Sequence, residues 1–171
     1  MTVAVETGLW QLDPAASTVA VRHKHMWGLV AVKGVFTTVG GQGEVKPDGS
    51  VTGTVTLDAT SLDTKNDKRD AHLRSADFFD AENHPEITFT LHGADVQGDS
   101  ARVTGELTAR GITKPLTFTA RLTGVDAQAV TVEAEAKVDR EDYGMTFNQL
   151  GMITRVSTVT VKLRFTRAQA S

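Results

Sequence analysis

The five histidines are the first side chains to consider for chemistry, because imidazole acts as acid, base or metal ligand near neutral pH. His23 and His25 lie two residues apart, so on one strand they would share a face and could chelate a metal ion. No third ligand follows nearby. We therefore expect no metal site, and we expect His23 to hydrogen-bond inside or at the rim of the fold. The other three are His72, His84 and His92, of which the last two are expected on the surface.

Motifs for nucleophilic catalysis or phosphate binding are absent from the sequence. There is no cysteine, which excludes a thiolate nucleophile, a thiolate metal site and a disulfide scaffold. Neither G-x-S-x-G nor H-E-x-x-H occurs. The glycine-rich segment Gly40–Gly43 lies between expected strands and not before a helix, so we interpret it as a turn or bulge. The sequence therefore predicts no catalytic residue and no cofactor.

Two clusters combine charged and aromatic residues. One covers 68–80 and contains Phe78 and Phe79; the other covers 139–144. Arginine binds phosphate or carboxylate groups through two parallel hydrogen bonds. Arg69, Arg74 and Arg140 are therefore candidate contacts for the head group of a ligand. The alternative, which we favour for any single charge, is a set of salt bridges and caps that fix the two loops.

Length and charge restrict the class of protein. The chain has 171 residues, a length typical of one domain, and a net charge of −3. Without a basic excess, a nucleic-acid partner is not expected. No run of 18 apolar residues occurs, and the N-terminus has neither a basic region nor a long apolar stretch. The sequence therefore predicts no integral membrane segment, no signal peptide and a cytoplasmic location.

Apolar and polar residues alternate along most of the chain, which is typical of half-buried strands. Short turn sequences between them favour an antiparallel up-and-down sheet, and closure of that sheet removes its edges. Eight strands make a barrel that can hold one small ligand. The eight predicted strands cover 17–24, 29–38, 51–58, 86–92, 101–110, 113–124, 129–139 and 157–166, with Leu9–Leu12 as a further short candidate.

Two connections, 59–85 and 140–155, are too long to be simple turns. In the first, Thr64 followed by Asp67 resembles a capping box, which predicts a short helix from Lys65 to Leu73. Two adjacent aromatic residues, Phe78 and Phe79, follow this helix. We expect them to pack at the mouth of the barrel.

The inward face carries several small residues, which would leave volume inside the barrel. A cavity lined mainly by apolar side chains would select an apolar guest, at about 0.8 kcal/mol for each CH₂ removed from water. Alternatively, the glycines relieve curvature while Phe36, Phe89 and Phe118 fill the interior. Alternation alone does not decide between these interpretations. The small inward residues are Gly34, Gly53, Gly105, Ala109, Ala120, Ala134 and Ala136.

Several motifs together resemble the YceI-like family. The most specific are R-D-x-H-L-R-S-x-D-F-F-D over 69–80 and G-x-L-T-x-R-G-x-T-K over 105–114. The similarity also includes Trp10–Asp13 with Ser17, Val21–His23, Gly34–Phe36, Pro85–Phe89 and Asp139–Gly144. The resemblance implies a lipocalin-like barrel with an extended hydrophobic pore. It also implies a ligand such as a polyisoprenoid, an isoprenoid quinone or another long amphiphile, and no enzymatic activity.

The sequence departs from that family in two respects. Ala16 stands where a D-x-x-H-S motif near the first strand often has histidine, so any polar contact from that histidine is absent. Many members also carry a secretion signal, which is not found here, so a periplasmic carrier role is in doubt.

Taken together, we predict an all-β, eight-stranded antiparallel lipocalin-like barrel with a short helix in the 59–85 connection. A single domain spans 1–171, with 1–7 as candidates for disorder. We predict that it binds a lipid or isoprenoid and, as an option, forms a homodimer. The alternatives are an enzyme that uses His23 with a carboxylate, and a packed barrel acting as a stress or interaction protein. The predicted ligand-binding residues are Val21, His23, Val32, Phe36, Leu73, Phe78, Phe79, Phe89, Phe118, Val132, Met145, Phe147 and Met152.

Overall fold

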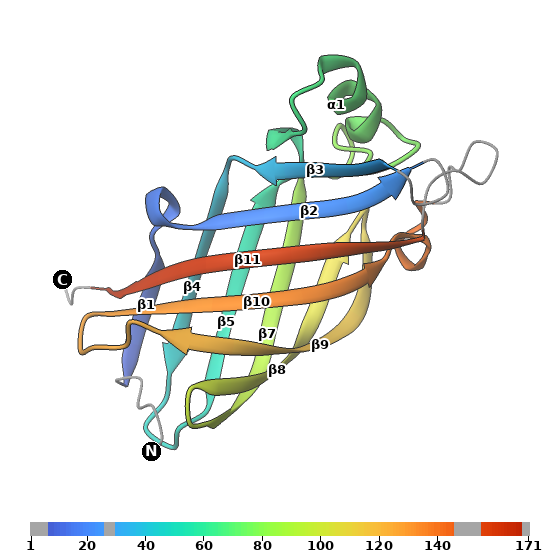
Figure 1. Ribbon diagram of the computed structural model, residues 1–171. Helices are drawn as coiled ribbons and strands as arrows, with labels where there is room; N and C mark the ends of the chain where they lie inside the picture. The colour runs from blue at the N-terminus through green and yellow to red at the C-terminus, as the bar shows by residue number, and fades with distance from the viewer. Residues whose placement is uncertain (1–6, 26–29, 146–154, 169–171) are drawn as a thin grey trace.

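The computed structural model is a closed, eight-stranded antiparallel barrel with one short α-helix (Figure 1). It describes residues 7–25, 30–145 and 155–168, without the side chains of 23–25, 30 and 31. The strands are β1 (Gly8–Leu12), β2 (Thr18–His25), β3 (Val30–Phe36), β4 (Val39–Val45), β5 (Val51–Asp58), β6 (Leu62–Asp63), β7 (Glu86–Gln97), β8 (Ser100–Ala109), β9 (Ile112–Thr123), β10 (Ala129–Asp139) and β11 (Val156–Arg167). The helix is α1 (Asp67–Arg74), and short 3₁₀ turns are η1 (Pro14–Ala16), η3 (Ala59–Ser61) and η4 (Arg140–Tyr143).

Eleven strand segments make eight barrel strands because two of the barrel strands are interrupted. β1 and β2 form one interrupted strand, with η1 between them, and both pair with β11. β3 and β4 form the other: β3 pairs with β2, and β4 pairs with β1. The barrel therefore closes through the antiparallel contact of β1 and β2 with β11. β6 is a two-residue addition on β3. The predicted fold class is confirmed, including the short strand at Leu9–Leu12.

The interpretation of Gly40–Gly43 as a turn or bulge is wrong, because these residues lie within β4. Strand β4 pairs with β5 along its whole length, and the two backbones approach closely. A Cβ atom on Gly41 would lie 2.9 Å from the carbonyl oxygen of Thr54. A Cβ atom on Gly53 would lie 2.7 Å from that of Gln42. Only glycine fits at these positions without a clash. Because glycine has no side chain, the alternation of apolar and polar residues that is typical of a strand is missing from this sequence.

The predicted helix is present, but its cap differs from the expected one. Asn66 is the N-cap, and its side chain accepts a hydrogen bond from the Arg69 amide at 3.0 Å. Thr64 instead donates its amide and hydroxyl to the buried carboxylate of Asp70. This contact ties the start of the helix to the segment that leaves β6.

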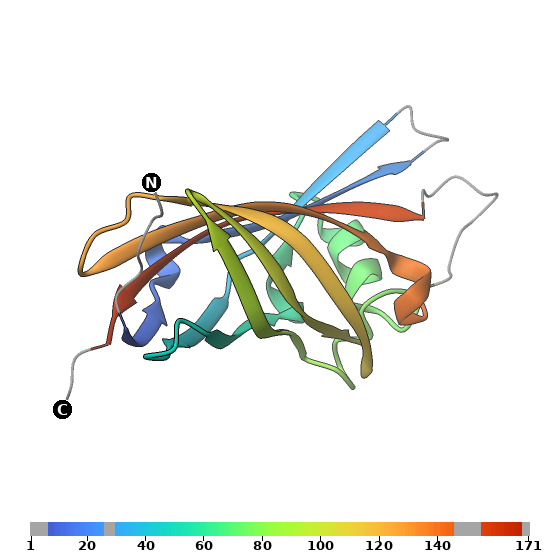
Figure 2. The ribbon, with the colours of Figure 1, turned by 90° about the horizontal axis from the view of Figure 1, so that it is seen from below.

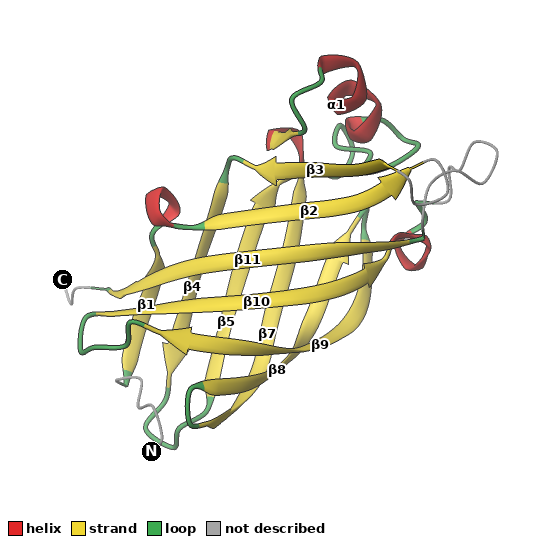
Figure 3. Cartoon of the chain, viewed as in Figure 1, coloured by secondary structure: helices red, strands yellow, loops and turns green. Residues whose placement is uncertain are grey.

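Helix α1 and turn η4 lie at one end of the barrel, and β1 lies at the other (Figures 1 and 3). The view from below shows the same arrangement (Figure 2). The wall between these ends includes the long strands β7 to β11 as well as β2 to β5, and alternate residues of these strands face inward. The two ends of the interior are therefore bordered by different elements.

Candidate functional site

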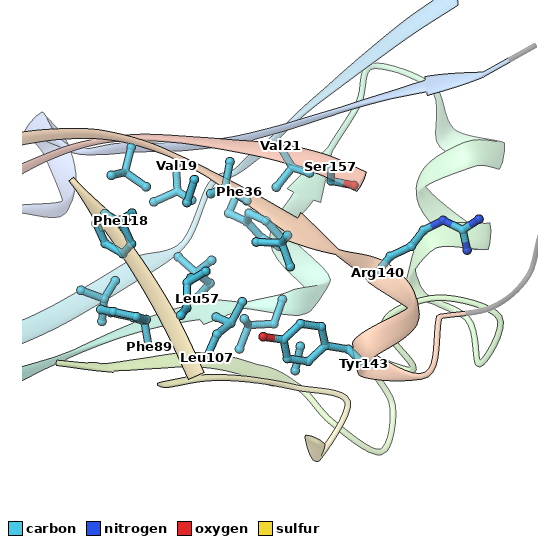
Figure 4. A pocket seen from close by; sticks show the side chains of 18 of the residues that line it. Val19, Val21, Phe36, Leu57, Phe89, Leu107, Phe118, Arg140, Tyr143 and Ser157 are labelled. Carbon is cyan, nitrogen blue, oxygen red and sulfur yellow. The ribbon is translucent and has the colours of Figure 1, made fainter. Parts of the chain in front are cut away.

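The barrel interior holds two cavities arranged end to end. One lies beside η4 and has a volume of about 170 Å³. The other lies toward β1, where the corresponding volume is about 410 Å³. We call them the first and the second compartment. Figure 4 shows the first compartment, with Tyr143 and Arg140 at one end and Phe89 and Phe118 at the other.

The compartments are lined by the residues whose alternation predicted an inward face. On β10 and β11, for example, the cross-strand pairs Ala134–Val161 and Ala136–Val159 both line the first compartment. Nearly all the side chains that line the first compartment are aliphatic or aromatic, whereas the second is also bordered by four polar residues of β4 and β5, namely Gln42, Glu44, Thr52 and Thr54. Among the described residues, the polar or charged groups that line the first compartment belong to Arg140, Tyr143 and Ser157.

A ring of five apolar side chains borders both compartments, and we call it the waist. Within it, the rings of Phe89 and Phe118 lie 5.5 Å apart, centroid to centroid. Gly105 makes room for Phe89, because a Cβ atom on Gly105 would lie 2.6 Å from the Phe89 ring. The volume expected beside Gly105 is therefore occupied by an aromatic side chain. The waist residues are Val55, Phe89, Phe118, Val161 and Leu163.

Arg140 begins η4 and is buried, with 6 % of its surface exposed. Its guanidinium donates a hydrogen bond to the carbonyl oxygen of Met145. The group points away from the first compartment, toward α1 (Figure 4). Burial lowers the pKa of the Arg140 guanidinium, while Glu141 and Asp139 act in the opposite direction.

Tyr143 ends η4 and is 4 % exposed. Its ring enters the first compartment, and its hydroxyl oxygen points inward, toward the side lined by Leu107 (Figure 4). Burial raises the pKa of the phenol, and the negative charge of Asp142 raises it further. The hydroxyl is therefore protonated at neutral pH and can donate a hydrogen bond.

A smaller cavity of about 40 Å³ lies between α1 and the barrel. Leu62, Leu73 and Phe78 line it, and Phe79 and Arg140 border both this cavity and the first compartment. The Phe79 ring contacts Phe36 edge to face, with centroids 6.0 Å apart. The two adjacent phenylalanines thus pack against the end of the barrel where η4 lies.

The structure brings most of the predicted ligand-binding residues to these cavities. Val132 lines the second compartment, and Leu73 and Phe78 line the small cavity. Val32 is buried but lines none of the three. Phe147, Met152 and the side chain of His23 lie outside the described part of the structure. Those that line the first compartment are Val21, Phe36, Phe79, Phe89, Phe118, Met145 and the head-group candidate Arg140.

The other two head-group candidates lie elsewhere. The Arg69 guanidinium donates hydrogen bonds to the hydroxyl of Thr64 at 2.8 Å and to the Thr64 backbone carbonyl at 2.7 Å. It therefore stabilises the loop before α1. Arg74 lines none of the three cavities. The contacts of Arg69 match the alternative in which a single charge fixes a loop.

Sequence reasoning missed two aromatic residues of the interior. Tyr143 was grouped with a charged cluster, although an aromatic residue within a polar turn is a signal for burial. Trp10 lines the second compartment from β1, and only a weak alternation marked that strand.

Two further features bear on the kind of site. In residues 7–25, 30–145 and 155–168, no group of three or more histidine or carboxylate side chains could hold a metal ion. None of the helices in these ranges is long and apolar enough to span a bilayer.

The sequence is similar to one known protein family and to curated members of it. The family model for the YceI-like domain matches residues 10–166. A curated relative, UPF0312 protein SAS2572 of Staphylococcus aureus, is 33 % identical over 145 residues, which is 80 % of this chain and 82 % of the relative. Protein YceI of Escherichia coli O6:H1 is 40 % identical over 96 residues, or 53 % of this chain. That match spans half the length of the E. coli protein.

Solved structures share the fold at low sequence identity. Burkholderia cenocepacia BcnA superposes with a TM-score of 0.81 at 21 % identity, over 90 % of this chain and 98 % of the other. A protein of Saccharophagus degradans described as a polyisoprenoid-binding domain superposes with a TM-score of 0.77 at 16 % identity, over 95 % of this chain and 100 % of the other.

Proposed function

The chain belongs to the YceI-like family, and from this membership and the geometry of its interior we propose that it binds a long apolar amphiphile inside the barrel. The proposed ligand is a polyisoprenoid, an isoprenoid quinone or a similar lipid. The protein would act as a carrier or a store, and no bond of the ligand is made or broken.

The apolar lining of the two compartments is the observation that carries this proposal. Removing one CH₂ group from water into such a lining is worth about 0.8 kcal/mol, so a long tail binds tightly without specific polar contacts. A polar or charged solute gains nothing comparable, because it would lose its hydration. The description of the S. degradans neighbour as a polyisoprenoid-binding domain supports the same class of ligand.

The alternatives receive less support from the described residues. A packed barrel would require side chains that fill the interior, whereas two compartments occupy it. An enzyme would require an acid–base pair at the cavity. The described lining of the first compartment holds no carboxylate and no histidine, and that of the second holds one carboxylate, Glu44, and no histidine to pair with it.

Native mass spectrometry and lipid extraction of the purified protein test the proposal. We expect a co-purifying lipid in the wild type. Ala136→Phe, which places a ring in the first compartment, should reduce the amount retained. Glu135→Phe is the matched control, because the neighbouring residue on β10 is exposed on the outer face.

Fluorescence provides a second measurement in solution. Trp10 lines the second compartment, and Trp27→Phe leaves Trp10 as the single tryptophan. We expect the emission of Trp10 to change when geranylgeraniol is added. An extract free of lipid, together with unchanged emission, would contradict the proposal.

A further inference from the structure

The Tyr143 hydroxyl points into an apolar space and is hydrogen-bonded to no described residue. The residue is 4 % exposed, and its hydroxyl points into the first compartment (Figure 4). No hydrogen bond joins it to any residue in the described part of the chain. No described side-chain nitrogen or oxygen is both inaccessible and unpaired, so the hydroxyl is open to the compartment and free to bond what fills it.

Neighbouring polar groups do not supply that partner. The Arg140 guanidinium is turned toward α1 and donates to Met145. Ser157 borders the same compartment from β11, but no hydrogen bond connects it with Tyr143 in the described structure. The rest of the lining shown in Figure 4 consists of carbon. The partner of the phenol must therefore come from what fills the compartment.

We propose that Tyr143 is the polar anchor of the cavity and donates a hydrogen bond to a neutral carbonyl-type oxygen on the head of the bound amphiphile. This inference rests on the proposed function, since it names the chemistry of the head within the same site. The corresponding ligand class comprises long-chain ketones, quinones and esters.

A charged head would fit this position poorly. A carboxylate or phosphate at Tyr143 would lose its hydration and gain one neutral donor in return, because the Arg140 guanidinium is turned toward α1 and donates to Met145. A carbonyl oxygen carries no net charge and accepts at most two hydrogen bonds, so one phenolic donor replaces much of the hydrogen bonding that it loses on leaving water. Because burial raises the pKa of Tyr143, the donor proton is kept at neutral pH.

The same anchor sets the direction of the ligand. Tyr143 lies at the end where η4 closes the first compartment, whereas Trp10 and Val45 line the far end of the second. A head held at Tyr143 directs the tail past the waist toward Trp10. The larger compartment is thereby left to the hydrocarbon.

A comparison of three probes on the full chain tests the inference. The probes are a geranylgeranyl methyl ketone, the hydrocarbon with a methylene in place of the carbonyl, and the carboxylic acid of the same length. Affinities are measured for the wild type and Tyr143→Phe, with Ser157→Ala as the control that removes the other hydroxyl of the compartment. The infrared carbonyl band of the bound ketone reports the hydrogen bond directly.

We expect the wild type to bind the ketone about tenfold more tightly than the hydrocarbon, as for one hydrogen bond. Tyr143→Phe should abolish this preference and leave hydrocarbon binding unchanged, and Ser157→Ala should retain it. The carbonyl band should shift to lower frequency in the wild type, a result that does not depend on the folding of any variant.

Several outcomes would overturn the inference. They are an unshifted carbonyl band, equal affinity of the wild type for ketone and hydrocarbon, or a preference for the acid. In each of these cases, hydrocarbon binding would leave the proposed function intact. Failure of all three probes to bind would overturn the proposed function as well.

Discussion

At the scale of single residues, η4 directs two long polar side chains in opposite directions. Arg140 extends toward α1, and Tyr143 extends into the barrel (Figure 4). Gly144 follows with φ of 75°, a conformation that glycine adopts without strain, and its amide closes the turn onto Arg140 and Glu141. The turn thus separates a cation near the helix from a neutral phenol in the cavity.

Tyr143 should make stability fall at alkaline pH. Its pKa is raised in the folded state, so the unfolded chain loses the phenolic proton first, above the ordinary value of 10.0. The stabilisation due to the neutral phenol is present below that pH and is lost as pH rises toward the folded pKa. We expect the free energy of unfolding of the wild type to fall more steeply above pH 10 than that of Tyr143→Phe.

Urea unfolding of both proteins at intervals from neutral to alkaline pH measures this difference. Lysines also titrate in this range, but they are common to both chains and cancel in the comparison. Parallel pH profiles of the two proteins would show that the phenol is not buried as the structure has it.

Asp70 is a second buried polar residue, and it holds α1 to the loop that precedes it. Asp70 is 7 % exposed, and its carboxylate accepts hydrogen bonds from the Thr64 amide at 2.9 Å and from the Thr64 hydroxyl. Asp70→Ala leaves a buried amide without a partner. We expect a loss of about 2–3 kcal/mol in the free energy of unfolding, typical of hydrogen bonds to a charged group.

Asp77→Ala is the control for that variant in urea unfolding. Asp77 pairs with His72 at 2.9 Å, but its side chain is half exposed, so its loss should cost less than about 1 kcal/mol. Equal effects of the two substitutions would contradict the assignment of Asp70 as the anchor of α1.

At the scale of elements, alternation predicts those strands that carry side chains on both faces. β9 and β10 were predictable because large and small apolar residues face inward against threonine and charged residues. β4 was not, since three of its seven residues are glycine. The end of β7 was missed because a bulge between Leu91 and Gly93 shifts the register and breaks the period.

The sequence predicts which residues line the candidate site, but it does not predict that the waist divides the site into two compartments. Inward residues follow from the period of two, and they do line the compartments. The waist depends on how Phe89 lies over Gly105, which is a contact across strands that no local pattern reports. Arg140 likewise borders the small cavity together with Leu73 of α1, a placement that no local pattern reports.

Phe118→Ala should open the waist and join the two compartments. Loss of a buried phenyl ring should cost about 3–5 kcal/mol, reduced by the partial exposure of the cavity wall. An alkyl chain that ends in a bulky pyrene group should then gain affinity relative to a plain chain, by about tenfold. Pyrene fluorescence in a titration measures this ratio.

Phe165→Ala is the matched control, since it removes the same ring from the wall of the second compartment and leaves the waist intact. It should not change the ratio of the two affinities. If both variants changed it equally, the waist would have no special part in selecting the tail.

At the scale of the whole molecule, the barrel has two apolar compartments in line, and its own side chains fill neither. An apolar surface without a contacting partner forfeits dispersion energy, so a guest that fills it should stabilise the fold. Ligand binding at a hundredfold excess over Kd is worth about 2.7 kcal/mol. For a domain of this size, that corresponds to a rise in Tm of roughly 5–10 °C.

The stabilisation should depend on the length of the chain that enters. In a series of methyl ketones of increasing chain length, each added CH₂ should strengthen binding by about 0.8 kcal/mol while the tail still advances into lined space. The gain should stop once both compartments are filled, because further carbons would remain in water. Thermal unfolding at fixed ligand concentration measures the series. A short ketone without a tail is the control, and its failure to shift Tm would show that the hydrocarbon supplies the stabilisation. A Tm that stayed constant along the whole series would mean that the tail does not occupy the barrel.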